Sequence, residues 1–145
     1  MIAKGTIVKR ASLIAPRTTA ITNTTTVTAN LDCLGAAYAV IKLHFAIEIN
    51  TNAVGPTISL LHSDDTTVTN FATIVADRAS EDISTAGRFI VYEVDMRHRK
   101  RYLRLAVSSG TATNDNLTFG ASSELWLNAA EPSSTTGRGE VVVIP

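Results

Sequence analysis

The chain has 145 residues, of which 45% are hydrophobic and 18% charged, and its formal net charge is zero. This length fits one domain that buries a core without disulfides or metals, and the composition is too apolar for a disordered chain. Neutrality argues against a protein that works mainly by neutralising phosphates or anionic lipid, so we expect neither nucleic acid nor membrane as partners. The first residues lack the apolar core of a signal peptide, which favours synthesis in the cytoplasm.

Residues 1–30 carry a weak hydrophobic pattern and a threonine-rich run, which predicts an N-terminal arm or peripheral strands. The core domain is expected over residues 31–127. It contains Cys33, the only cysteine, which we interpret as a small buried hydrophobe. From Ala39 to Ile49, apolar residues alternate with polar ones over eleven positions, which predicts a long strand with a bend or bulge.

Further short alternating segments follow along the chain. Strands are predicted at 57–62, 71–75, 89–96 and 101–107, and residues 117–127 complete the core with Phe119, Leu125 and Trp126. The compact charged turn between the segments 89–96 and 101–107 predicts that these two strands form a hairpin. Short strands separated by turn signals indicate an all-β fold, an antiparallel β-sandwich or jelly roll with extended N- and C-terminal arms.

The C-terminal tail, residues 128–145, begins with a segment of linker-like composition and ends in four apolar β-formers. These are Val141, Val142, Val143 and Ile144. Such a segment needs a pairing partner, because an unpaired apolar strand is prone to aggregate. It could pair within its own sheet, or it could add a strand to a neighbouring subunit.

Residues that could carry chemistry do not form a recognisable constellation. The three histidines, His44, His62 and His98, lack metal-ligand spacing, and no nucleophile motif or phosphate-binding loop occurs. The Asp64-Asp65 pair is better explained as a turn than as a calcium loop. We therefore predict no catalytic, cofactor-binding or metal-binding residues, and a protein that is not an enzyme.

One cluster of positive charge stands out. It comprises Arg97, Arg99, Lys100 and Arg101, with His98 and Arg104 beside them. We favour a solvated turn over a contact with a protein partner, and a protein contact over nucleic acid, because no row of aromatic residues accompanies the charges.

Several short motifs, taken together, resemble small structural proteins of tailed bacteriophages, namely capsid decoration (cement) proteins and related minor virion components. The motifs are Ile58-Ser-Leu-Leu-His-Ser-Asp-Asp-Thr-Thr, then Phe71, then Tyr92-Glu-Val-Asp, and Lys100-Arg-Tyr-Leu-Arg-Leu, within residues 36–107. The resemblance implies a β-sandwich or jelly roll on the virion surface. It also implies a homotrimer bound to the major capsid protein, and no catalytic residues.

The resemblance makes a cement protein that stabilises the head at junctions of capsid subunits the first hypothesis. A phage tail or fibre component is one alternative, and a carbohydrate-binding β-sandwich module with Tyr92 or Tyr102 as sugar contact is another. The candidate protein contacts are the basic segment, Trp126 and the tail, although a core position is the preferred interpretation of Trp126. By residue they are Arg97, Arg99, Lys100, Arg101, Trp126, Val141, Val142, Val143 and Ile144.

Overall fold

The computed structural model describes residues 7–15, 21–22, 26–46, 56–79, 88–109, 116–127 and 140–144. These residues form strands, turns and one short 3-10 turn, η1, at Val68–Asn70, and they contain no α-helix. The strands are β1 (Ile7–Ile14), β2 (Ile21–Thr22), β3 (Thr26–Asp32), β4 (Tyr38–Phe45), β5 (Thr57–Ser63), β6 (Ala72–Ala79), β7 (Arg88–Asp95), β8 (Tyr102–Ser108), β9 (Asn116–Leu117), β10 (Phe119–Trp126) and β11 (Glu140–Ile144).

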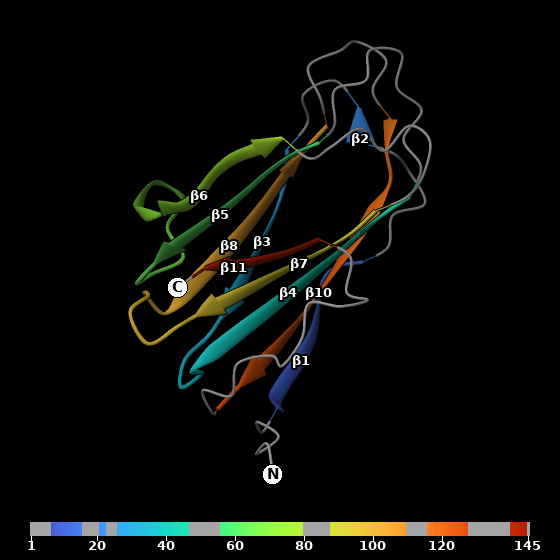
Figure 1. Cartoon of the computed structure of the whole chain (residues 1–145). Coiled ribbons are helices and arrows are strands. Elements are labelled where there is room, and N and C mark those ends of the chain that lie inside the picture. The colour runs from blue at the N-terminus through green and yellow to red at the C-terminus, as the bar shows by residue number, and fades with distance from the viewer. Residues whose placement is uncertain are drawn as a thin grey trace.

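Two sheets pack face to face (Figure 1). The first has the order β1-β10-β4-β7-β11, and the second has the order β3-β8-β5-β6, while β2 and β9 form a separate small pair. All neighbours in both sheets are antiparallel except β11, which runs parallel to β7.

The connections identify the fold as a jelly roll. With the small β2–β9 pair set aside, each successive strand from β1 to β10 lies in the opposite sheet, except that β5 and β6 are neighbours in the second sheet. The resulting orders β1-β10-β4-β7 and β3-β8-β5-β6 are those of two interlocked Greek keys. The predicted all-β sandwich or jelly roll is therefore confirmed, and the strand order selects the jelly roll.

One end of the sandwich, which we call the turn end, carries three short connections (Figure 1). They join β3 to β4, β5 to β6 and β7 to β8. In the first of them Gly35 has φ +78°, a left-handed conformation that an L side chain rarely adopts, so the glycine permits the tight turn. All three connections lie within the described residues, and they bring together side chains far apart in the sequence.

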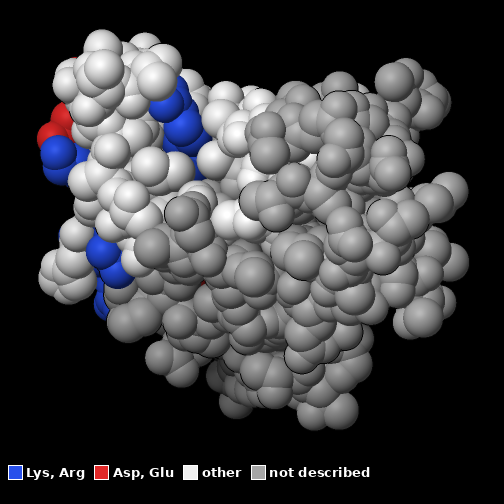
Figure 2. All heavy atoms as spheres, turned by 90° about the horizontal axis from the view of Figure 1, so that it is seen from above, with Lys and Arg blue, Asp and Glu red and all other residues white. Residues whose placement is uncertain are grey.

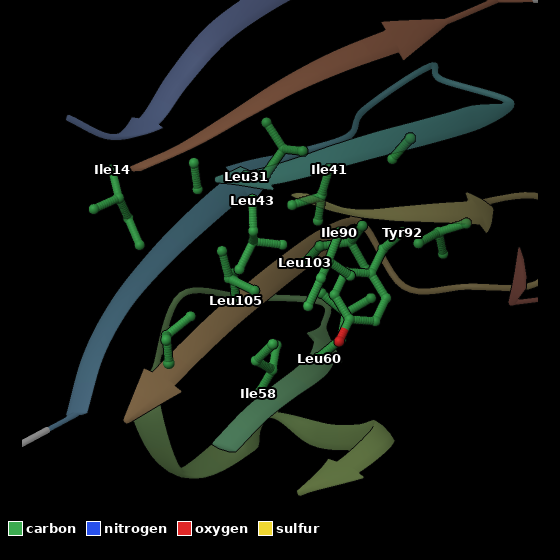
Figure 3. Close-up of a cluster of buried hydrophobic side chains, with 14 of the residues drawn as sticks. Ile14, Leu31, Ile41, Leu43, Ile58, Leu60, Ile90, Tyr92, Leu103 and Leu105 are labelled. Atoms are coloured by element: carbon green, nitrogen blue, oxygen red, sulfur yellow. The ribbon is translucent and has the colours of Figure 1, made fainter. Parts of the chain in front are cut away.

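The core fills the space between the sheets (Figure 3). The alternation predicted for the segment from Ala39 is observed, because Ala39, Ile41, Leu43 and Phe45 are all fully buried. Opposite them, the second sheet contributes Ile58, Leu60, Leu103 and Leu105. Cys33 is 3% exposed and belongs to this core, as expected. Residues 47–49, the end of the predicted long strand, lie outside the described residues.

The predicted hairpin between the segments 89–96 and 101–107 is wrong. β7 lies in the first sheet and β8 in the second, so the charged turn crosses the sandwich from one sheet to the other. A short turn between two alternating strands fits both arrangements. The choice depends on which edges find partners, and here β7 pairs with β4 while β8 pairs with β3 and β5.

The predicted arms are strands where the structure describes them. β1 forms one edge of the first sheet along β10, and β3 forms an edge of the second. At the other end of the chain, β11 pairs with β7 of the same chain, from Glu140 opposite Ile90 to Ile144 opposite Val94. Of the two alternatives for the tail, the structure therefore has pairing within its own sheet. The linker-like residues 128–139 lie outside the described residues.

Candidate functional site

The outer face of the first sheet carries several described side chains that are partly exposed and could recognise a partner. Because successive side chains of a strand point to opposite faces, the residues between the core positions of β4 and β10 form this outer face. The strand register aligns them in rows across the sheet. Three features follow one another along it: an aromatic row at the turn end, a charged centre, and a hollow toward the opposite end.

The aromatic row consists of the rings of Trp126 and Tyr38, together with the guanidinium group of Arg97 that lies against Tyr38. Trp126 lies directly opposite Tyr38 in the β10–β4 pair, and Tyr38 lies opposite Asp95 in the β4–β7 pair. Arg97 extends back over this row: its Nη2 donates to the Tyr38 hydroxyl at 3.0 Å, and its guanidinium carbon is 5.4 Å from the Tyr38 ring centroid. Its Nε donates to Asp95 Oδ1 at 2.9 Å, and Nη2 contacts the other carboxylate oxygen. The guanidinium is therefore held in one orientation before any partner arrives.

The charged centre is built on Glu124. Its Oε1 is 3.1 Å from Lys42 Nζ and 3.5 Å from Arg10 Nε, so one carboxylate is shared by cations from two neighbouring strands. Such partly exposed ion pairs contribute little to stability, but they fix the position of the Lys42 ammonium beside the hollow.

The hollow has a volume of about 410 Å³. Its walls include Lys42, His44, Phe89 and Ser122, and Gly120, which lies opposite His44 in the strand register, leaves a position without a side chain. The rings of His44 and Phe89 meet edge to face, with centroids 6.1 Å apart and planes at 71°. The hollow is in the size range of small-ligand sites, and it combines an aromatic ring with hydrogen-bonding groups.

The basic turn between β7 and β8 is not a free cationic patch. Arg97 pairs with Asp95, Arg101 Nη2 is 2.7 Å from Asp32 Oδ2, and Lys100 Nζ is 3.4 Å from Asp64 Oδ2. On the face seen in Figure 2 the Lys and Arg side chains form separate patches, one of them directly beside carboxylates. The pairing joins the three turns of the turn end, which favours a structural or protein-contact role for these charges over binding of phosphates.

The electrostatics of the turn end follow from these contacts. The hydrogen bonds from Arg101 and Arg97 lower the pKa values of Asp32 and Asp95 to about 2. His62 Nδ1 accepts a hydrogen bond from the backbone N–H of Lys100 at 3.3 Å. Burial and the adjacent positive charges lower the pKa of this imidazole, so its neutral, accepting form is favoured.

The Asp64-Asp65 segment is a turn, as predicted. The Ser63 hydroxyl accepts a hydrogen bond from the Asp65 N–H at 3.2 Å. The Asp65 carboxylate accepts hydrogen bonds from the Thr67 N–H at 2.7 Å and from Asn70 Nδ2 at 2.8 Å. These contacts lower the pKa of Asp65 and account for its carboxylate without a bound cation.

Within the described ranges, no three His, Cys, Asp or Glu side chains gather closely enough to hold a metal ion. Burial raises the pKa of the Cys33 thiol to about 12, which opposes a role as nucleophile. No helix in the described part of the chain is long and apolar enough to span a membrane.

The preferred core position of Trp126 is wrong. Its neighbour Leu125 is 3% exposed and points into the core, so Trp126 points to the outer face, where it is partly exposed. The sequence Leu-Trp-Leu at 125–127 does not show which of these side chains face the core, because all three are apolar. The structure thus brings Trp126 and Arg97, two of the predicted contact residues, to either side of Tyr38.

The other predicted contact residues are dispersed. Arg99, Lys100 and Arg101 lie in the β7–β8 turn, and the backbone of residues 141–144 forms β11 at the far edge of the first sheet. Tyr38 and Phe89 were missed as candidate contacts. The sequence does place each of them between the core positions of an alternating strand. Alternation, however, does not show which outer-face side chains stay exposed in the folded protein.

No protein-family model matches the sequence, and no curated protein matches it either. Among solved structures, the chain is similar to a structure of the infectious bursal disease virus Gx strain, with a TM-score of 0.51, 9% identity, and coverage of 88% of this chain and 33% of that one. It is also similar to the VP2 subviral particle of infectious bursal disease virus, with a TM-score of 0.52, 9% identity, and coverage of 89% of this chain and 34% of that one. The chain therefore spans about a third of the length of these viral chains. At such low identity the similarity establishes a fold shared with viral capsid proteins.

Proposed function

We propose that the protein is a virion structural protein, most specifically a capsid decoration protein of a tailed bacteriophage that binds at junctions between major capsid protein subunits. The observation that carries the proposal is the jelly-roll strand order, which combines with the sequence resemblance to decoration proteins and with the capsid proteins of similar fold. In this role the protein acts by adding buried area to the shell and performs no catalysis. Its site of action is the capsid surface, after synthesis in the host cytoplasm.

The aromatic row is the contact surface that we assign to the shell. Trp, Tyr and Arg are the residues that most often dominate the binding energy of protein interfaces, and here they lie side by side on one sheet face. Leu127, 49% exposed, follows Trp126 directly at the turn end and adds apolar area. Because Asp95 already orients Arg97, little side-chain entropy is lost when the row is covered.

The test is binding to shells assembled from the major capsid protein encoded in the same genome. The full-length chain is added to these shells, bound protein is quantified after sedimentation, and its position is determined by electron cryomicroscopy. We expect density at junctions between subunits, and at least tenfold weaker binding for Trp126→Ala and Leu127→Asp. Absence of binding to intact shells, or a label on the tail of whole particles, would contradict the proposal, and the latter result would favour a tail or fibre component.

A matched control uses the exposed apolar residue of another turn. Val68 is 73% exposed and lies in η1, so Val68→Asp introduces the same charge on the second sheet's side of the turn end. Arg10→Ala removes an exposed arginine from the edge strand β1, which is not part of the aromatic row. Both variants should bind shells normally. If they weaken binding as much as Leu127→Asp does, the aromatic row is not the contact surface.

The proposed homotrimer is tested by the mass of the purified protein in solution. Because β11 pairs with β7 of its own chain, we expect a variant without residues 128–145 to keep the oligomeric state of the full chain. Multi-angle light scattering compares the two. A monomeric full-length chain would remove the trimer from the proposal, and a trimer that dissociates on truncation would show that the tail joins subunits.

A further inference from the structure

We propose that the hollow on the outer face of the first sheet binds a segment of neutral saccharide, an activity separate from binding to a shell. Phe89 is 41% exposed, and it is the only exposed Phe, Tyr or Trp side chain among the residues whose side chains the structure describes. An aromatic ring held in a hollow offers a flat apolar surface to the C–H face of a sugar ring. The edge-to-face contact with His44 holds Phe89 in place without covering it completely.

Hydrogen-bonding groups surround this ring. Lys42, Ser12 and Ser122 lie in one row across β4, β10 and β1, and all three line the hollow. An ammonium group has three donors, so the ion pair of Lys42 with Glu124 leaves further donor capacity for a ligand. Hydroxyl groups both donate and accept, which matches the hydroxyls of a sugar.

The charges at the hollow disfavour a cationic ligand, and the remaining polar groups select a neutral ligand over an anion. Lys42 and Arg10 share the carboxylate of Glu124, and the residues described as lining the hollow include no carboxylate. Lys42 is the one ammonium or guanidinium group in this described lining and Glu124 partly neutralises it, whereas Ser12, Ser122 and Thr118 supply hydroxyl groups. A cation would find no negatively charged group in the described lining.

The strand pairing argues against an extended peptide as the ligand. At the hollow, His44 is paired with Gly120 on one side and with Phe89 on the other, so the backbones of β10, β4 and β7 are hydrogen-bonded to one another. A peptide strand binds most readily at an unpaired sheet edge, and these three strands present none at the hollow; of the strands that line it, β1 is the edge strand, and it contributes Ser12 and Ile14. Recognition by β10, β4 and β7 therefore comes from side chains, as it does for sugars.

The interpretation of Tyr92 as a sugar contact is wrong, and the hollow replaces it. Tyr92 is fully buried, and its ring projects into the core between the sheets (Figure 3). Tyr102 lies on the second sheet, where the guanidinium carbon of Arg101 is 4.8 Å from its ring centroid. Tyr102 therefore serves as the matched aromatic control for Phe89.

The experiment probes the full-length protein on an array of neutral oligosaccharides, with acidic oligosaccharides and peptides as separate arms. The strongest neutral ligand is then titrated by calorimetry. We expect binding to neutral oligosaccharides, weakened about tenfold or more by Phe89→Ala and unchanged by Tyr102→Ala. Thermal melts of both variants establish that each is folded. Ser122→Phe, which fills the hollow from an exposed position, should also abolish binding.

The outcomes separate the alternatives. No binding to any neutral oligosaccharide, binding confined to acidic oligosaccharides, or binding confined to peptides would each overturn the inference. Neutral binding that Tyr102→Ala removes and Phe89→Ala does not would also overturn it, by moving the site to the second sheet. Shell binding by Phe89→Ala should remain normal, so this test and the test of the virion role fail independently.

Discussion

Arg104 provides the sharpest test of the packing argument. It is 8% exposed on the outer face of the second sheet, where its guanidinium carbon is 3.8 Å from the Phe71 ring centroid. Its Nε donates to Asn30 Oδ1 at 2.8 Å, and Nη1 donates to the Val68 carbonyl at 3.4 Å. One side chain thus joins β8 to β3 and to η1. We predict that Arg104→Met, which keeps most of the volume, destabilises the protein.

The magnitude follows from the contacts that are lost. A desolvated cation–π contact contributes about 1–2 kcal/mol, and the two hydrogen bonds from the charged donor add about 3 kcal/mol. Removing the buried charge returns about 2–3 kcal/mol of desolvation cost, which leaves a net loss of about 2 kcal/mol. For a domain of this size, that loss lowers Tm by about 4–8 °C.

The assay is urea unfolding of Arg104→Met, Phe71→Leu and the double variant. The cycle should give a coupling free energy of about 1 kcal/mol between the two side chains. A second cycle with Arg101→Met and Tyr102→Leu is the control, since Arg101 also stacks on an aromatic ring but is solvent-exposed, and its coupling free energy should be smaller. The couplings are compared rather than the single losses, because Arg101→Met also removes the ion pair with Asp32. Equal coupling in the two cycles, or no coupling between Arg104 and Phe71, would refute the argument that burial strengthens the Arg104 contact.

Three further predictions concern titration and reactivity. The lowered pKa values of Asp32 and Asp95 mean that their carboxylates stabilise the folded state above pH 4, and that this contribution is lost as pH falls toward 2. In urea unfolding, the free energy of unfolding of Asp32→Asn and of Asp95→Asn should change less between pH 4 and pH 2 than that of the wild type. A change as steep as in the wild type for both variants would contradict the lowered pKa values. Because the pKa of His62 is lowered in the folded state, the contribution of its neutral imidazole to the stability of the fold is present above pH 6.5 and is lost as pH falls below it. The free energy of unfolding of His62→Gln should therefore decrease less between pH 7.5 and pH 5 than that of the wild type. The Cys33 thiol, buried and with its pKa raised to about 12, should react with a thiol reagent at pH 8 only after unfolding, whereas rapid reaction of the folded protein would show that the site opens.

The alternation of side chains made the fold class predictable. It identified the segments that became β4, β5, β7 and β8 as strands, and their core side chains fall on one parity because a residue's face in a strand depends only on its position along the strand. The turn chemistry around Asp65 was equally local, since it requires only side chains and backbone groups within a few residues.

Pairing across the sheets was not predictable in the same way. The segments of β7 and β8 look like a hairpin because a short turn joins two alternating strands, yet they lie in different sheets. Which edges pair depends on the total burial of all strands together, and no local pattern encodes that sum.

The candidate site shows the same division. The sequence by itself determined that the chain is a neutral all-β domain, and it drew attention to Arg97 and Trp126. Only the tertiary structure decided that these two residues flank Tyr38, and that Lys100 and Arg101 are paired with carboxylates far away in the sequence, those of Asp64 and Asp32. The physical reason is that strand order and register, which arise from packing two sheets around one core, determine which outer-face side chains become neighbours.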